Sequence, residues 1–335
     1  MEYLFNFSVS FSGGGLKRLL AYAEYFEKNG GAYFIVHVSL QGKFANHQNN
    51  IYYYVEQSSF QRLLNDCGYL GEISRKHPEV KVYFSYGIPI YKRHFKVNWF
   101  HLSNLLPFKD SKIKLSLKDE VKMHLLKKRV TAGFKRCDVI SAESQHSLDV
   151  IGQSYLGKKV LLQNGVNDEL VETNGSIRSN TAVTIGAYSY KNLDLLVKVF
   201  DEIKEKHGLE KLLIVGEVNT IGKCSFLRRV DIELLGAVPQ KRVYELLSES
   251  RVYLSMSMIE NSSNASLEGV LLCKMAYLSF IPPHLELLKS VPYREEEICG
   301  HKVLVSHQED VRKNLQQVSW RDVILEMLEV AKVHL

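Results

Sequence analysis

The chain has 335 residues, enough for two domains of ordinary size, and its 45% hydrophobic and 24% charged residues are typical of a globular protein. No apolar run approaches the ~18 residues of a membrane-spanning helix, and the start of the sequence lacks the basic and apolar regions of a secretion signal. The five cysteines are scattered and odd in number, without Cys-x-x-Cys spacing, which argues against a disulfide framework and a zinc site. We therefore expect a cytoplasmic protein.

The first half alternates short β-rich runs with helical stretches, which predicts a parallel sheet built from βαβ units. The expected strands are 3–9, 33–39, 82–85, 97–102, 139–142 and 160–163. Gly13, Gly14 and Gly15 stand between the first strand and a helix predicted over 16–29. Segment 43–60 is rich in Asn, Gln and Tyr, and its pattern supports no firm assignment.

A strongly basic stretch covers 112–136. Its nine basic residues are Lys112, Lys114, Lys118, Lys122, Lys127, Lys128, Arg129, Lys135 and Arg136. Leu117, Val121, Leu125 and Phe134 approximate helical spacing, which predicts an amphipathic helix decorated by the basic residues. Either this is simply a solvated helix surface, or the charge attracts an anionic membrane or a phosphate-bearing acceptor. Nucleic acid is disfavoured because no recognisable binding module accompanies the charge.

The polar segment 167–180 is the best candidate for a linker, and the alternation restarts after it. The expected strands are then 182–186, 211–215, 232–235, 252–256 and 276–281, and the expected helices are 193–206, 242–249 and 322–335. This order predicts an α/β protein with two Rossmann-like domains, 1–168 and 169–319, facing each other across a cleft. The C-terminal helix, about 320–335, is expected to pack back on the first domain. A cleft between two such domains suits a reaction of two substrates.

Two carboxylates, Glu260 and Glu268, are separated by seven small or polar residues. Glu260 follows a predicted strand, and Glu268 lies where the next helix is expected to begin, in its first turn. Ligands of open α/β sheets bind at the carboxyl ends of the strands, and the N–H groups at a helix start favour anions such as phosphate. The pair therefore predicts a ligand site, although two acids on a solvated loop would have the same spacing.

Three further features are candidates for the same site. His101 ends a predicted strand, and Lys191 opens a predicted helix where a cation would meet a diphosphate; a structural histidine and a surface lysine are the simpler alternatives. The glycines at 13–15 would let backbone N–H groups approach a phosphate, but their spacing matches neither the dinucleotide fingerprint nor a P-loop. The sequence has no Asp-x-Asp, no cluster with metal-ligand spacing and no Gly-x-Ser-x-Gly elbow.

In these residues the chain resembles the retaining glycosyltransferases of family 4, which have the GT-B fold, and especially bacterial enzymes of O-antigen, lipopolysaccharide and other surface polysaccharide biosynthesis. The segments that carry the resemblance in the second half are 184–186 with Lys191, 213–216, 235–238 and the Glu-x7-Glu motif at 259–268. In the first half, the segments in family-like order are 13–15, 100–101, 141–144 and 164–166. The Glu-x7-Glu motif is the specific part of this match.

The resemblance implies a retaining hexosyltransferase that moves a sugar from a UDP- or GDP-linked donor to a hydroxyl of a glycan, for instance a lipid-pyrophosphate-linked oligosaccharide, without a metal or other cofactor. It implies that Glu268 binds the ribose hydroxyls, Glu260 lies near the donor sugar, and Lys191 neutralises the leaving diphosphate. It places His101 near the sugar on the acceptor side, as a second catalytic residue. Its other donor contacts are Gly13, Gly14, Gly15, Gly216, Gly236, Val238, Asn261, Asn264, Ala265 and Ser266.

The sequence departs from the family at three places. Ala187 and Tyr188 stand where a second basic residue usually precedes the lysine, so Lys17 or Arg18 is expected to contact the phosphates. The segment 282–283 is Pro-Pro where a glycine pair is usual, and position 269 is glycine where alanine is usual, which bears on the geometry of the sugar pocket. Two alternatives are a non-catalytic nucleotide- or sugar-binding protein and an oxidoreductase or epimerase with a nucleotide cofactor.

Overall fold

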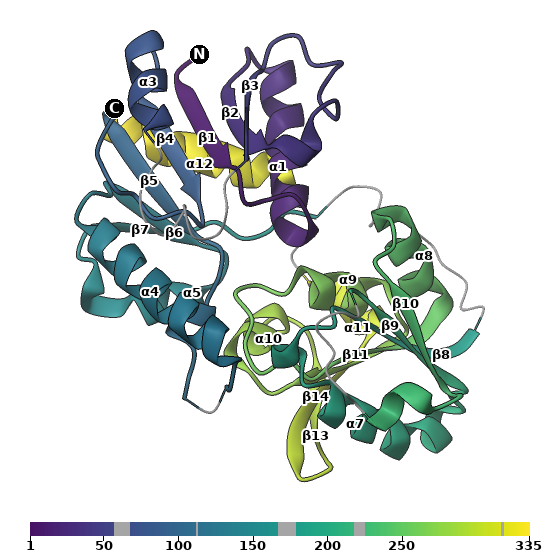
Figure 1. Ribbon diagram of the computed structural model, residues 1–335. Helices are drawn as coiled ribbons and strands as arrows, with labels where there is room; N and C mark the ends of the chain where they lie inside the picture. Colours follow the sequence, from purple (N-terminus) through teal and green to yellow (C-terminus); the bar gives the residue numbers. More distant parts are fainter. Residues whose placement is uncertain (57–67, 112, 167–178, 218–224, 316–317) are drawn as a thin grey trace. The chain divides into compact units, whose positions relative to one another are not determined.

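A computed structural model describes residues 1–56, 68–111, 113–166, 179–217, 225–315 and 318–335. The chain divides into two compact units, one made of Met1–Gly165 with Val318–Leu335 and the other of Val166–Gln317. Each unit is built on one seven-stranded sheet, so the predicted α/β class with two Rossmann-like domains is confirmed (Figure 1). Most of the predicted linker, 167–178, lies outside the described residues. Within these ranges, no helix is long and apolar enough to cross a membrane.

The sheet of the first unit is entirely parallel, in the order β3-β2-β1-β4-β5-β6-β7. Its strands are β1 (Tyr3–Phe7), β2 (Tyr33–His37), β3 (Ile51–Val55), β4 (Val82–Tyr86), β5 (Val97–Leu102), β6 (Val139–Ala142) and β7 (Lys158–Leu161). The helices of this unit are α1 (Gly13–Lys28), α3 (Tyr69–Lys76), α4 (Leu117–Phe134), α5 (Gln145–Ile151) and α12 (Trp320–His334). The order of the strands reverses between β1 and β4, which is where open α/β sheets bind their ligands.

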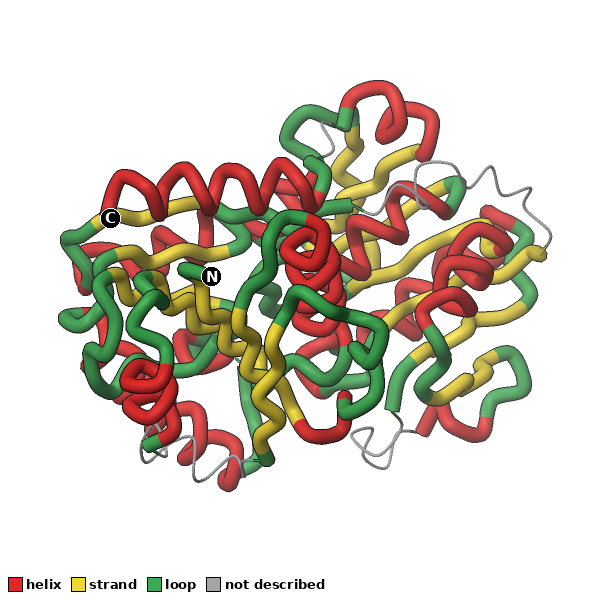
Figure 2. The backbone as a smooth tube through the Cα atoms, turned by 90° about the horizontal axis from the view of Figure 1, so that it is seen from above, coloured by secondary structure: helices red, strands yellow, loops and turns green. Residues whose placement is uncertain are grey.

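Helices α1 and α12 pack together on one face of this sheet. Buried aromatic residues of the strands, among them Phe5, Phe7 and Trp99, form one core with Tyr22 of α1 and Ile324 of α12. In Figure 2 the helix that ends at the marked C-terminus runs beside the strands of the first sheet. Ser319 caps α12 with a complete capping box, which fixes where this returning helix begins.

Helix α4 packs on the opposite face, because the ring of its Phe134 lies against that of Phe100 in β5, with centroids 6.2 Å apart. The helix predicted in the basic stretch therefore exists, but its predicted apolar side is wrong. The buried residues of α4 are Met123, Val130, Gly133 and Phe134, whereas Leu117, Val121 and Leu125 are exposed. At about 100° per residue, the exposed three and Phe134 cannot share one face of a helix.

The sheet of the second unit has the order β10-β9-β8-β11-β12-β14-β13, parallel except for its last two pairings. Its strands are β8 (Ser179–Ile185), β9 (Lys211–Val215), β10 (Ile232–Gly236), β11 (Ser250–Ser255), β12 (Met275–Ser279), β13 (Tyr293–Ile298) and β14 (His301–His307). Its helices are α7 (Leu193–His207), α8 (Gln240–Glu249), α9 (Asn264–Leu272), α10 (Pro282–Leu287) and α11 (Gln308–Asn314). Here the order reverses between β8 and β11.

Every predicted strand is present, with ends within three residues of the expected ones, but β3 and the hairpin of β13 and β14 were not predicted. Strand β3 is a half-exposed edge strand that pairs only with β2, within a segment rich in polar residues. In the hairpin, Cys299 and Gly300 both have positive φ, 52° and 72°, as a two-residue turn with the twist of its strands requires. A Cys-Gly pair is not the usual sequence signal for that turn, and charged residues hide the strand that precedes it.

Candidate functional site

In the second unit, Lys191 and Glu260 form an ion pair at the point where the strand order reverses. Lys191 ends a short 3-10 turn (η4, Ser189–Lys191) after β8, and Glu260 lies in the loop after β11, so both follow carboxyl ends of neighbouring parallel strands. Lys191 Nζ donates to Glu260 Oε1 over 2.5 Å, and the two side chains are only 10% and 12% exposed. The backbone N–H of Met258 also donates to the carbonyl of Tyr190, which ties the two loops together.

Helix α9 begins four residues after Glu260. Its cap is Ser263, whose hydroxyl accepts a hydrogen bond from the backbone N–H of Ser266 over 3.1 Å. Asn264 is the first residue of the helix and Ala265 the second, so Glu268 lies in the second turn rather than in the predicted first turn. Asn264 and Ala265 are half-buried, as is Asn261 in the loop, whereas Ser266 and Glu268 are buried.

A hydrogen-bond chain connects the start of α9 to His284, in the segment that departs from the family. His284 is fully buried; its Nε2 lies 3.0 Å from the hydroxyl of Ser266, and its Nδ1 lies 2.9 Å from the carbonyl of Ser279. A carbonyl only accepts, so the imidazole proton is on Nδ1 and the Ser266 hydroxyl donates to Nε2. Burial lowers the pKa of His284 to about 4, so this histidine is neutral at physiological pH.

Ser279 extends the same chain to the loop after β11, since its hydroxyl donates to the carbonyl of Ser257 over 2.6 Å. His284 therefore links three segments: the first turn of α9, the end of β12 and the start of the Glu260 loop. Sequence reasoning did not identify His284 as a site residue. The only signal was the unusual Pro-Pro pair before it, which starts α10 without two backbone N–H groups.

Position 269 has a packing reason to be glycine. The ring of Tyr253, in β11, lies against the backbone of Gly269, and a Cβ at this position would be 2.3 Å from Tyr253 Cγ. The departure from the family's alanine is therefore matched by a large buried ring on the neighbouring strand. The absence of a side chain at this position lets α9 lie close to the buried ring of Tyr253 in β11.

The glycines predicted to contact the donor lie at the ends of neighbouring strands. Gly216 follows β9 and Gly236 ends β10, and the N–H of Gly216 donates to the carbonyl of Gly236 over 2.8 Å. The N–H of Gly186, after β8, donates to the carbonyl of Val215 over 2.7 Å. Val238 lies two residues beyond β10 and is half-buried beside the core under the sheet. These residues and the Lys191 turn lie along the same edge of the second sheet, where its parallel strands end.

In the first unit, the three glycines are not a loop between strand and helix. Gly13, Gly14 and Gly15 form the first turn of α1, preceded by Ser12, whose side chain makes no capping hydrogen bond. Gly15 lies against Ser10 and Tyr86, because a Cβ there would be 2.9 Å from Ser10 Oγ and 3.1 Å from Tyr86 Cε1. The start of a sixteen-residue helix thus lies at the carboxyl edge of β1 and β4.

The structure gives Arg18 a different role from the expected phosphate contact. Its side chain is completely buried, and its Nη2 donates to the carbonyls of Leu162 and Gln163 and to Asn164 Oδ1 over 3.0–3.1 Å. Its guanidinium also lies over the ring of Trp320, 5.1 Å from the centroid, so it ties α1 to the loop after β7 and to α12. Sequence reasoning was wrong here because an arginine near a helix start has no local signal for burial. The neighbouring Lys17 is half-buried.

His101 is fully buried in β5, with a hydrogen-bonding partner within reach of Nδ1 but none within hydrogen-bond distance of Nε2. Trp99 Nε1 donates to Ser141 Oγ over 2.7 Å, and Ser141 Oγ lies 2.8 Å from His101 Nδ1. The hydroxyl hydrogen of Ser141 is therefore available to Nδ1, which leaves the ring proton on Nε2. Nε2 lies 3.6 Å from Glu143 Oε1, longer than a normal hydrogen bond.

Glu143 is the centre of a buried polar network that sequence reasoning missed. Its Oε1 accepts from the hydroxyl of Tyr86 over 2.9 Å, and its Oε2 accepts from Asn164 Nδ2 over 3.1 Å. Burial raises the pKa of the Glu143 carboxyl, but the imidazole of His101 and the charge of Arg18 outweigh it and hold that pKa below its ordinary value. Burial and Arg18 likewise lower the pKa of His101 to about 4. The one available signal was the position of Glu143 within the family-like segment 141–144.

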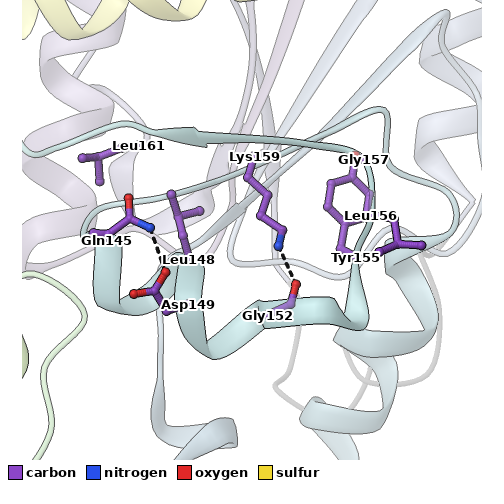
Figure 3. Close-up of a pocket in the computed structure, with 9 residues that line it drawn as sticks. All are labelled: Gln145, Leu148, Asp149, Gly152, Tyr155, Leu156, Gly157, Lys159 and Leu161. Atoms are coloured by element: carbon purple, nitrogen blue, oxygen red, sulfur yellow. Dashed lines mark hydrogen bonds between the residues drawn. The ribbon is translucent and has the colours of Figure 1, made fainter.

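Figure 3 shows a pocket in the first unit, and its volume is about 650 Å³. It is lined by Gln145, Leu148, Asp149, Gly152, Tyr155, Leu156, Gly157, Lys159 and Leu161. No predicted site residue is among them. Its polar side chains bind within its own wall, since Gln145 donates to Asp149 over 2.8 Å and Lys159 donates to the carbonyl of Gly152 over 2.5 Å. Among the described residues there is also no group of three His, Cys, Asp or Glu able to hold a metal ion.

Solved structures match the chain over almost its full length, whereas no protein-family model and no curated protein matches it. HepE of Anabaena, solved in complex with UDP-glucose, has a TM-score of 0.64 at 12% identity, covering 99% of this chain and 100% of HepE. A glycosyltransferase from Rickettsia africae has a TM-score of 0.65 at 16% identity, and sucrose-phosphate synthase from Thermosynechococcus elongatus one of 0.66 at 10%, each with 99% of this chain and 98% of the other covered. At these identities the likeness establishes the fold, and the expected GT-B fold is confirmed.

Proposed function

We propose that this chain is a glycosyltransferase that moves a sugar from a nucleotide-sugar to a hydroxyl of a glycan acceptor. The observation that carries the proposal is the Lys191–Glu260 ion pair at the strand reversal of the second sheet, beside the start of α9. This is a cation at the place where α/β sheets bind nucleotides, next to a helix end that favours phosphate. The solved structures of HepE with UDP and with UDP-glucose support a UDP-linked donor, and a GDP-linked donor is the other candidate.

The chemistry of the reaction fits these residues. Glycosyl transfer develops negative charge on the leaving diphosphate and positive charge at the anomeric carbon. Lys191 and the N–H groups at the start of α9 would stabilise the diphosphate, since preorganised charges and dipoles act on the transition state without reorganisation. Glu260 would hold Lys191 in position and lie beside the reacting sugar, and Glu268 would bind the ribose hydroxyls.

The family resemblance suggests further donor contacts, which we propose for each unit by itself. In the second unit these are backbone groups at Gly216, Gly236 and Val238 and the polar side chains of Asn261, Asn264 and Ser266, with Ala265 between the last two. In the first unit the turn of Gly13, Gly14 and Gly15 would face the phosphates, with Lys17 as the remaining basic candidate there. His101 would act on the acceptor side of the sugar, with its proton on Nε2 as the hydrogen bonds around it favour.

We further propose retention of the anomeric configuration, as the family resemblance implies, without a metal. The leaving phosphate would help to deprotonate the acceptor hydroxyl on the same face of the sugar. The alternative is a covalent intermediate, which needs a carboxylate within reach of the anomeric carbon. Activity in the presence of EDTA tests the metal-independent proposal, and NMR of the first product anomer tests retention.

The acceptor we propose is a lipid-pyrophosphate-linked oligosaccharide of O-antigen or another surface polysaccharide, reached at the inner face of the cytoplasmic membrane. The basic stretch 112–136 supports this acceptor, because it would attract both the pyrophosphate and an anionic membrane. A soluble glycan is the other candidate acceptor. Transfer measured side by side to lipid-linked and soluble oligosaccharides distinguishes the two.

The proposal is tested by hydrolysis and transfer from a panel of UDP- and GDP-sugars. Glu260→Gln and Lys191→Gln should each lower turnover at least about a hundredfold, a loss typical for groups that stabilise transition-state charge. Glu205→Gln and Lys198→Gln, at exposed positions on α7, are the matched controls and should leave turnover unchanged. Binding of a donor without any hydrolysis or transfer would favour a non-catalytic binding protein, and full turnover by Glu260→Gln would contradict the role given to Glu260.

A further inference from the structure

Helix α4 presents an apolar stripe to solvent, formed by Leu117, Val121 and Leu125. Their spacing of four residues places the three side chains on one face of the helix. Their exposed fractions are 82%, 54% and 41%, although residues of this kind are usually buried. The helix is held to its own sheet by the opposite side, through Met123, Val130 and Phe134. The packing of the described residues therefore gives the stripe no partner of its own.

Basic side chains lie along one side of this stripe and beyond its end. The exposed ones in and beside α4 are Lys114, Lys118, Lys127, Lys128, Arg129 and Lys135. At about 100° per residue, Lys128 continues the line of the stripe, and Lys118 and Arg129 lie along one side of it. The acidic residues of α4 lie in its first turn, where Asp119 accepts from the cap Ser116 and Glu120 pairs with Lys109 over 2.9 Å. The exposed surface is thus apolar along the stripe and positively charged along one side of it and beyond its C-terminal end.

We propose that α4 is a membrane-contact helix whose apolar stripe enters the interface of an anionic bilayer while the basic residues beside it and beyond its end bind the phosphate headgroups. A helix with an apolar stripe and a basic border lies in the plane of the interface, and its binding combines apolar burial with electrostatic attraction. This proposal deepens the membrane location given under the proposed function and rests on it only for its biological meaning, since vesicle binding can be measured without any donor.

Two other occupants fit the surface less well. A second copy of the chain, paired through a two-fold axis, would place the lysines of one α4 against those of the other. A protein partner would be expected to meet aromatic or arginine anchors, whereas this surface has aliphatic side chains and mostly lysines, which protein interfaces disfavour. Lysine stems instead suit a bilayer, because they lie along apolar surface while the ammonium group reaches the headgroups.

The first test is co-sedimentation of the full chain with vesicles. The unsubstituted chain should bind vesicles containing about 30% phosphatidylglycerol at about 0.1 M salt and bind pure phosphatidylcholine at least about tenfold more weakly. The triple variant Leu117→Ser, Val121→Ser and Leu125→Ser should lose at least about tenfold in binding, because it removes apolar burial. The matched control is Val230→Ser with Val333→Ser, whose side chains are 95% and 84% exposed elsewhere, and it should bind like the unsubstituted chain.

A second test separates insertion from adsorption by charge alone. Both native tryptophans are buried, Trp99 fully and Trp320 with 9% exposed, so Val121→Trp adds an exposed reporter in the stripe. On anionic vesicles its emission should shift to the blue and be quenched by brominated lipid chains. Replacing Lys118, Lys128 and Arg129 by glutamine should weaken binding on the order of a hundredfold at low salt, at about 1 kcal/mol for each basic residue.

Three results would overturn the proposal: no binding of the unsubstituted chain to anionic vesicles, equal binding by the stripe variant, or an emission of Val121→Trp that vesicles leave unchanged. An acidic protein as the true partner would give the first of these. Donor hydrolysis by the unsubstituted chain, measured without vesicles, reports separately on the proposed function. A chain that hydrolyses a donor but ignores vesicles contradicts the membrane contact alone, and the reverse result contradicts the glycosyltransferase proposal alone.

Discussion

Lys191 and Glu260 lie 69 residues apart in the chain, yet their side chains form one nearly buried ion pair with a 2.5 Å contact. Each carries a charge that the other neutralises, and the loops that hold them leave neighbouring parallel strands. Removing one partner therefore leaves the other charge in a poorly solvated position. The pair thus has a structural consequence that can be measured independently of any substrate.

A double-mutant cycle tests this coupling. Glu260→Gln and Lys191→Met should each lower the free energy of unfolding by about 3 kcal/mol, because each leaves a nearly buried charge unpaired. The double variant should lose less than the sum of the two, since it removes both charges, and the coupling energy should lie at about 0.5–3 kcal/mol. Urea unfolding of the four proteins gives the cycle. Additive losses would show that the two side chains do not interact in solution.

Gly269→Ala should destabilise the second unit, although alanine is normally the better helix residue by about 1 kcal/mol. The new Cβ would be 2.3 Å from Tyr253 Cγ in a packed interior, and overpacking of this kind costs about 1–3 kcal/mol. Gly71→Ala in α3 is the control, because a Cβ there meets only the side chain of His94, at 3.3 Å. Thermal unfolding should show a lower Tm for Gly269→Ala, and shortening Tyr253 to leucine in that background should recover part of it. An unchanged Tm would contradict the close approach of the ring and the helix.

Arg18→Met should cost about 3–5 kcal/mol of stability in the first unit. The substitution removes the donor to the carbonyls of Leu162 and Gln163 and leaves the buried Glu143 without its nearby cation, 3.9 Å away. Lys28→Met, at the other end of α1, removes an exposed pair with Glu24 and should cost less than about 1 kcal/mol. Denaturant unfolding compares the two. If Arg18 instead served a bound phosphate, Arg18→Met would leave stability unchanged and weaken only donor binding.

The stability of the protein should fall between pH 6.5 and pH 4 through His284. Its pKa is about 4 in the folded protein, below the ordinary value of about 6.5 expected in the unfolded chain. As the pH falls through this window the unfolded chain takes up a proton that the folded chain does not, so the contribution is fully present above pH 6.5 and lost by pH 4. The loss amounts to about 3 kcal/mol for one such group.

His284→Asn isolates this contribution, because an asparagine amide can still donate to the carbonyl of Ser279 but cannot titrate. The free energy of unfolding, followed from pH 7 to pH 4, should decline less steeply in the variant. The difference in slope should correspond to about one fewer proton taken up on unfolding. The buried His101, whose pKa is also lowered to about 4, should give the same change of slope in His101→Asn. Parallel pH profiles for the variants and the unsubstituted protein would contradict the buried, neutral state of these rings.

What the sequence by itself determined is local or periodic. The alternation of apolar runs and helical stretches predicted every strand but β3 and the hairpin of β13 and β14, because the other strands contain apolar runs between turn residues. The spacing of Glu260 and Glu268, between the end of a strand and the start of a helix, is also a local pattern that the sequence shows directly. The family resemblance added an expected role for each carboxylate.

The tertiary structure alone decided which side chains meet. The pairing of Lys191 with Glu260, the burial of Arg18 among carbonyls of the loop after β7, and the link from His284 to Ser266 all join segments that are distant in sequence. The exposure of Leu117 depended on which side of α4 packs on the sheet. No periodicity records such contacts, because they arise from the order in which strands assemble and from the faces that this order covers. The sequence therefore determined the elements and the candidate carboxylates, and the assembled second sheet determined that Glu260 pairs with Lys191.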